Sequence, residues 1–114
     1  MLPSLSGIWI GTTRDDNAAQ HWRMVQRGDD VHIFFTYEEQ PVPTYCHIAR
    51  IVDGILRIRN YPRADAVFVS AEHFVLPNWE GEGNMLFSRE GLAEMMAPSA
   101  WVRYDEMMKR RDQL

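Results

Sequence analysis

Short apolar runs recur at near-regular spacing over residues 1–88, and turn-forming residues separate them. This pattern is typical of an antiparallel meander, in which each strand turns back beside the preceding one. The fold class that follows is all-β, an antiparallel up-and-down sheet. The runs predict eight strands, at about residues 6–13, 20–27, 31–38, 45–52, 55–60, 66–70, 73–77 and 84–88.

The strongest turn signal is Asp53-Gly54, because both residues tolerate the positive φ angles of a two-residue hairpin turn. Such a turn fixes the register of the flanking strands and therefore assigns each side chain to one face of the sheet. Arg50 then faces Arg57 on the outer face, with Arg59 beside them. The inner face carries the pairs Ile51–Leu56, Ala49–Ile58 and His47–Asn60.

A second hairpin, around residues 28–30, also separates an apolar face from a mixed face. Pairing Gln26 with Val31 gives its register, and the apolar pairs are then Met24–Ile33 and Trp22–Phe35. Two hairpins that each have one apolar face are what a barrel or a strongly curled sheet requires. The expected interior of the barrel is formed by Trp22, Met24, Ile33, Phe35, His47, Ala49, Ile51, Leu56 and Ile58.

From Arg89 onward the apolar residues recur at helical spacing, which predicts one or two helices after the last strand. Pro98 interrupts the helical pattern, and Ser99 is the expected N-cap of the second helix. The basic residues 109–111 fall in its last turns, where cations interact favourably with the helix dipole. We expect one domain (residues 1–114), composed of a β-barrel (1–88) and a helical tail (89–114).

Composition and charge narrow the function classes. The hydrophobic fraction of 46% and the charged fraction of 25% are those of an ordinary globular protein. The net charge of −4 argues against nucleic acid as a partner, because phosphate backbones are bound by dense basic surfaces. The lone Cys46 cannot form an internal disulfide, which favours a reducing compartment over the alternative of a secreted protein without disulfides. No apolar run reaches membrane-spanning length, so we expect a cytoplasmic protein without a membrane partner.

Specific residues in the first and last strands carry a family resemblance. Gly7-Ile8-Trp9 resembles the Gly-x-Trp entry of the lipocalin and fatty-acid-binding (calycin-like) superfamily of small β-barrels, and Arg89 resembles the arginine that packs across that tryptophan. A helix after the final strand is also similar to lipocalins. The resemblance implies a calycin-like barrel that closes over Trp9 and holds a small hydrophobic ligand.

The stretch of residues 5–11 additionally resembles the opening of nitrobindin-like haem barrels, which place a haem-ligating histidine late in the chain. The last histidine here is His73, at a predicted turn. We therefore expect no haem and no other cofactor.

His47 is the titratable residue that the register places inside the barrel. It could contact a ligand, act as a base or bind a metal or haem. We favour the alternative of an interior histidine that is hydrogen-bonded to Asn60 or Tyr45. Cys46 points to the opposite face, so it cannot share a metal ion with His47, and we expect no metal site.

Two further features each allow two interpretations. Trp79, in a glycine-rich acidic stretch, could cover a barrel mouth or cap the core. The outward cluster of Arg50, Arg57 and Arg59, with Arg63 near it, could dock an acidic partner or only be solvated.

The favoured function is non-catalytic binding of a small apolar or amphipathic molecule. The alternative is an interaction module or homodimer with a filled core, which uses the C-terminal helix or the arginine cluster. An enzyme built around His47 has the least support. An empty cavity favours the first interpretation, whereas many large interior side chains favour the second. The predicted ligand-binding residues are Trp22, Met24, Phe35, Tyr37, His47, Ile58 and Trp79.

Overall fold

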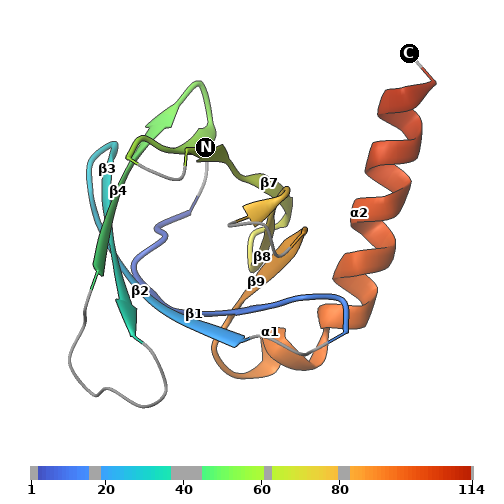
Figure 1. Cartoon of the computed structure of the whole chain (residues 1–114), viewed down its shortest axis with the longest axis horizontal. Helices are drawn as coiled ribbons and strands as arrows, with labels where there is room; N and C mark the ends of the chain where they lie inside the picture. Colours follow the sequence, from blue (N-terminus) through green and yellow to red (C-terminus); the bar gives the residue numbers. More distant parts are fainter. Residues whose placement is uncertain (1–2, 16–18, 37–44, 61–62, 80–82, 114) are drawn as a thin grey trace.

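A computed structural model of the chain describes residues 3–15, 19–36, 45–60, 63–79 and 83–113 (Figure 1). The fold is mostly β, as predicted, and forms a nearly closed antiparallel barrel with a C-terminal helix. The strands are β1 (Gly7–Thr12), β2 (Ala19–Arg27), β3 (Asp30–Thr36), β4 (Tyr45–Val52), β5 (Ile55–Ile58), β6 (Ala64–Asp65), β7 (Val67–Ser70), β8 (His73–Leu76) and β9 (Met85–Arg89). The helices are α1 (Leu92–Met95) and α2 (Ala97–Asp112).

All nine strands belong to one sheet, in the order β6-β5-β4-β3-β2-β1-β9-β8-β7. The two edge strands, β6 and β7, are separated in the chain by Ala66 alone, whose N–H donates to the carbonyl of Leu56 at 2.9 Å. The sheet therefore curls until its two edges are joined by the chain itself (Figure 1). The two-residue strand β6 lies between the strands predicted at about residues 55–60 and 66–70, and it was not predicted because two residues show no alternation pattern.

The predicted registers of both hairpins are confirmed. Trp22 lies opposite Phe35 in the β2–β3 pair, and Ala49 lies opposite Ile58 in the β4–β5 pair. Asp53 and Gly54 have φ values of 53° and 76°, as expected for the predicted two-residue turn. The β4–β5 pairing ends at Ile58, two residues before the predicted strand end.

Aromatic rings from distant strands contact one another in the described part of the barrel interior. Trp22 and Phe87 have ring centroids 4.0 Å apart, and Phe87 stacks on Phe74 at 5.0 Å with an interplanar angle of 11°. Trp9 packs against Phe74 at 5.0 Å. A Cβ atom at Gly11 would lie 2.4 Å from the Phe87 ring, so this glycine provides the space that the ring occupies.

Helix α2 packs on the outer face of β7, β8 and β9 (Figure 1). Its buried residues Ala100 and Tyr104 cover outward side chains of these three strands, namely Val69, Val75 and Leu86. The predicted N-cap at Ser99 is wrong, because α2 begins at Ala97 and includes Pro98 in its first turn. Proline is tolerated there, since the first N–H groups of a helix have no partner within the helix.

Candidate functional site

The predicted ligand-binding residues that the structure describes lie together in the core of the barrel. They are Trp22, Met24, Phe35, His47, Ile58 and Trp79, and all six are buried. Tyr37 lies outside the described residues. The His47 ring centroid is 5.7 Å from that of Trp22, 6.2 Å from Phe35 and 5.4 Å from Trp79. Trp79 is therefore part of the packed core.

Gln20 provides a hydrogen-bond acceptor within this core, and the sequence analysis did not identify it. Its Oε1 accepts hydrogen bonds from the indole N–H groups of Trp22 at 3.1 Å and of Trp79 at 3.3 Å. One amide oxygen thus satisfies two buried indoles, which need a partner when they leave water. The strand alternation places Gln20 on the same face as Trp22, and this was the available signal.

Asn60, the predicted partner of His47, has a backbone role. Its Oδ1 accepts a hydrogen bond from the Ile48 N–H at 2.9 Å, just beyond the end of the β4–β5 ladder. A hydrogen bond between His47 and Asn60 remains a prediction.

Arg89 closes one end of the barrel against Trp9, as the family resemblance implied. The guanidinium carbon lies 4.6 Å from the centroid of the Trp9 ring, within cation–π range. The same guanidinium forms an ion pair with Glu72 at 2.9 Å and donates to the carbonyls of Ser4 and Ser6. Arg89 therefore connects the N-terminal segment to the β7–β8 turn.

A pocket of about 480 Å³ lies between the barrel and the C-terminal helices, and we call it the helix-side pocket. Its apolar walls come from β7, α1 and α2, and its rim is polar. The apolar lining is Val69, Leu92, Ala93, Met96 and Ala100. The polar lining is Ser70, Glu72, His73, Arg89, Glu90, Ser99 and Arg103.

His73 lies at the back of the helix-side pocket and is 5% exposed. It is the first residue of β8, where the predicted strand at about residues 73–77 also begins after a turn. Its Nε2 lies 2.7 Å from the Ala93 carbonyl oxygen, which can only accept, so Nε2 carries a proton. Its Nδ1 lies 2.8 Å from the Ser70 hydroxyl. The imidazole therefore links the β7–β8 turn to helix α1 and fixes the pocket wall.

Alternation along β8 explains why His73 points outward. Phe74 and Leu76 belong to the barrel core, so His73 and Val75 face the helices. The partner of the imidazole is 20 residues further along the chain, and no local pattern identifies it. The sequence therefore indicated the face but not the contact.

Arg103 borders the helix-side pocket from α2. Its Nη1 donates to the carbonyl of Val69 at 3.0 Å, which attaches the helix to β7. The remaining guanidinium donors form part of the pocket rim.

A second pocket of about 510 Å³ borders α1 and the start of α2, and its lining includes Arg14 and Trp101. The Arg14 guanidinium carbon lies 4.3 Å from the Trp101 ring centroid, and its Nη1 donates to Asp105 at 3.1 Å. These contacts hold α2 to the segment after β1. Burial raises the pKa of the neighbouring Tyr104 phenol, and the positive charge of Arg14 opposes this shift.

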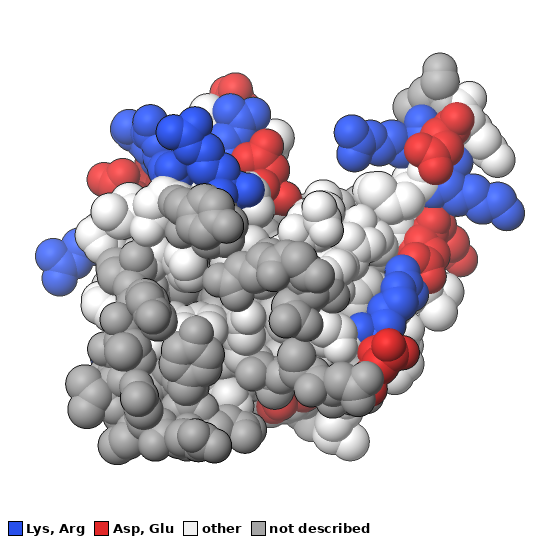
Figure 2. Space-filling model, in the orientation of Figure 1, with Lys and Arg blue, Asp and Glu red and all other residues white. Residues whose placement is uncertain are grey.

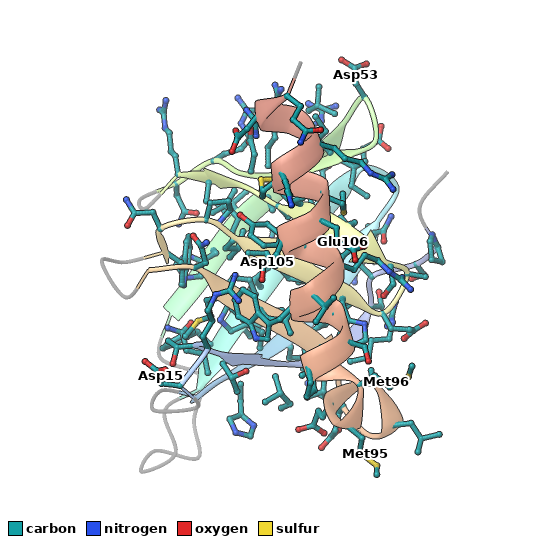
Figure 3. The ribbon with its side chains drawn as sticks, turned by 90° about the vertical axis from the view of Figure 1, so that its right-hand side faces the viewer. Asp15, Asp53, Met95, Met96, Asp105 and Glu106 are labelled. Atoms are coloured by element: carbon teal, nitrogen blue, oxygen red, sulfur yellow. The ribbon has the colours of Figure 1, made fainter. Side chains whose placement is uncertain are left out.

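The junction between α1 and α2 exposes large apolar side chains beside both pockets. Leu92, Met95 and Met96 are 80%, 78% and 58% exposed. Figure 3 shows Met95 and Met96 at the foot of α2, on the outside of the molecule.

The described residues contain no group of three His, Cys, Asp or Glu side chains arranged to hold a metal ion. Within those same residues, neither helix has the length and apolar character needed to cross a bilayer. The site is thus an apolar hollow with a polar rim on the outside of a nearly closed nine-strand antiparallel barrel. Comparisons of the chain with protein-family models, with curated proteins and with solved structures find no match.

Proposed function

We propose that the protein is a non-catalytic binder of a small apolar or amphipathic molecule, and that this molecule binds in the helix-side pocket. The observation that carries the proposal is a hollow of about 480 Å³ with apolar walls and a polar rim. Pockets for small organic ligands occupy about 300–1,000 Å³ and combine apolar walls with a few polar groups. The helix-side pocket has both properties.

The packing of the barrel interior favours this location over the interior. A ligand inside the barrel would have to displace the stacked rings of Trp22, Phe74 and Phe87. Protein interiors are packed to crystal-like density, so such a displacement is costly. In this proposal, the interior residues that the sequence predicted to bind the ligand instead stabilise the fold.

The polar rim sets the orientation of the ligand. Its apolar part packs against Val69, Met96 and Ala100, and its polar end faces Ser70 and Arg103. Both ring nitrogens of His73 already have hydrogen-bond partners in the protein. In this proposal His73 therefore forms part of the pocket wall, and the polar residues of the rim bind the ligand.

The calycin-like family assignment belongs to the same proposal. Gly7-Ile8-Trp9, the contact of Arg89 with Trp9 at 4.6 Å and the meander topology support it. The lone Cys46 supports a reducing, cytoplasmic location.

The test is to block the pocket from its rim. Ser99→Trp places an indole at the entrance from an exposed position of α2, and Glu106→Trp adds the same side chain to α2 away from the pocket. The probe is 1-anilinonaphthalene-8-sulfonate, followed by fluorescence, with lauric acid as competitor. We expect wild type and Glu106→Trp to bind it, and Ser99→Trp to bind at least 10-fold more weakly.

Equal binding by Ser99→Trp and wild type would contradict the location of the site. If Trp22→Phe lowered dye binding while Ser99→Trp did not, the site would lie inside the barrel. Absence of binding by all variants would favour the second candidate function.

That candidate is an interaction module, and the exposed apolar side chains of Leu92, Met95 and Met96 favour it. Large exposed apolar residues that lie together often mark contacts with another protein. A homodimer formed through this junction would dissociate in Met95→Glu, and sedimentation velocity would show the change from dimer to monomer. A wild type that is monomeric at high concentration would exclude the homodimer.

A further inference from the structure

Four arginines form a basic surface on the outer side of β4, β5 and the segment that leads into β6. This arginine face consists of Arg50, Arg57, Arg59 and Arg63. In Figure 2, blue arginine side chains gather over the segment that is green in Figure 1. The helix-side pocket lies on other strands, so the proposed ligand-binding function does not involve this surface.

One row of residues across four strands contains two arginines and two aspartates, so its net charge is zero. The registers place Asp30, Arg50, Arg57 and Asp65 side by side across β3, β4, β5 and β6. Arg50 is 3.9 Å from Asp30, and Arg57 is 3.6 Å from Asp65. Each aspartate thus compensates one arginine, although the two arginines lie directly opposite each other.

The next row has no such compensation. The β5–β6 register ends at the pair Ile58–Ala64, and the next residues of the two neighbouring segments are Arg59 and Arg63, which line one pocket. Among the described residues, no ion pair involves either of these two arginines. Like charges directly opposite on neighbouring strands destabilise a sheet. The fold therefore bears an electrostatic cost at this position that a bound anion would remove.

A concave surface lies where these side chains meet. A pocket of about 250 Å³ is lined by Arg57, Arg59, Arg63 and Asp65, together with Ile58 and Ala64, and we call it the arginine pocket. Its three guanidinium groups and one carboxylate have a local charge of +2. A doubly charged anion would balance this charge, whereas one carboxylate would not.

We propose that the arginine pocket binds the phosphoryl group of a small molecule. Guanidinium groups donate planar, paired hydrogen bonds that match phosphate oxygens, and such charge-assisted bonds are stronger than neutral ones. A volume of about 250 Å³ is below the range of whole organic ligands, so the pocket holds one anionic group and not an entire drug-sized molecule.

The charge of the remaining surface argues against a large polyanion. The arginine face together with Asp30 and Asp65 has a charge of +2. Because the chain carries −4 in total, the rest of the protein carries −6. The negatively charged remainder of the protein would repel nucleic acids and anionic membranes over distances of about 10 Å at ordinary ionic strength.

The experiment measures binding of inorganic phosphate by calorimetry at constant ionic strength, with sodium acetate and hexaglutamate as competing anions. Arg59→Gln removes the central guanidinium, and Arg63→Gln is the second variant in case the first fails to fold. Arg27→Gln, at an exposed strand end outside the arginine pocket, is the matched control. We expect phosphate affinity to fall about 10-fold or more in both pocket variants and to stay unchanged in the control.

Thermal melts give an independent readout. Without phosphate, Arg59→Gln should melt at the same temperature as wild type or higher, because a like-charge pair is removed. Phosphate should raise the melting temperature of wild type and of Arg27→Gln but not of Arg59→Gln. Equal stabilisation of all variants by phosphate would overturn the proposal, as would tighter binding of hexaglutamate than of phosphate.

Discussion

The protein contains two apolar layers that are built differently. Inside the barrel, the rings of Trp9, Trp22, Phe74 and Phe87 contact one another and are fully buried. Outside, between β7–β9 and α2, aliphatic strand residues pack against two alanines and the three large α2 residues Trp101, Tyr104 and Met108.

The difference follows from side-chain size on the facing elements. The barrel core receives large rings from several strands, so little volume is left between them. Further along α2 the large residues Trp101, Tyr104 and Met108 pack on the sheet, but α1 and the start of α2 present only alanines, namely Ala93, Ala97 and Ala100. Small side chains cannot fill the space beside a curved sheet, and pockets of about 480 and 510 Å³ remain next to them. The layer that contributes less packing is therefore the one that offers space for a ligand.

The largest expected effect comes from substituting two adjacent residues of β9, one in each apolar layer. Phe87 points into the barrel and Leu86 points under α2. Phe87→Ala should lower the free energy of unfolding by about 3–5 kcal/mol, because a cavity opens among packed rings. Leu86→Ala should lower it by about 2–3 kcal/mol, since α2 can move toward the sheet. Urea denaturation measures both values, and a larger loss for Leu86→Ala would reverse the ranking of the two layers.

Gly11 tests whether the interior is packed without spare volume. Its added Cβ would meet the Phe87 ring at 2.4 Å, so Gly11→Ala should destabilise the protein by about 1–3 kcal/mol. The double variant Gly11→Ala/Phe87→Leu should lose less than the sum of the two single variants, because the smaller side chain makes room. Strictly additive losses in urea denaturation would show that the ring and the glycine are not coupled.

Arg89 tests how the two layers are connected at the barrel end. Arg89→Ala removes the contact with Trp9 and the ion pair with Glu72, and should lower the free energy of unfolding by about 1–2 kcal/mol. Arg23→Ala, on an exposed position of β2, should change it by less than about 0.5 kcal/mol. Chemical denaturation measures the free energy of unfolding of both variants. Equally small losses for the two variants would argue against a structural role for the cation–π contact.

The smallest effect concerns the pH dependence of the outer layer. Burial raises the pKa of Tyr104 above its ordinary value of 10.0 in the folded state. Its contribution to stability is complete below about pH 10 and is lost as the pH rises through the raised pKa. Stability should therefore fall more steeply above pH 10 in wild type than in Tyr104→Phe. Urea denaturation between pH 8 and 11 measures this slope, and identical slopes would show that Tyr104 does not contribute.

The strand pattern and the hairpin registers were predicted from the sequence because their causes are local. Asp53-Gly54 fixes the turn between β4 and β5, and the alternation of side chains then assigns each residue to a face. The helical tail was also predicted, since its apolar spacing changes at Arg89. Its N-cap was not, because Pro98 is compatible with the first turn of a helix as well as with an interruption.

The helix-side pocket could not be predicted from such local sequence patterns. The sequence predicted a ligand site among interior residues such as Trp22 and His47, because alternation identifies an inner face, and this site stays a prediction. His73 lies at the start of a predicted strand, but its hydrogen bond to Ala93 joins residues 20 positions apart and has no local signal. The pocket depends on where α2 lies on the sheet, which no local pattern specifies.

By itself, then, the sequence determined an antiparallel barrel, two hairpin registers, an apolar interior face and a helix after the last strand, because turn chemistry and side-chain periodicity act over a few residues. The tertiary structure alone decided that the interior rings contact one another in the described part of the barrel, that β6 brings the sheet edges together, and that a pocket remains beside the helices. Each of these depends on the distance between segments that are far apart in the chain, which is set by the volumes of all the side chains packed between them.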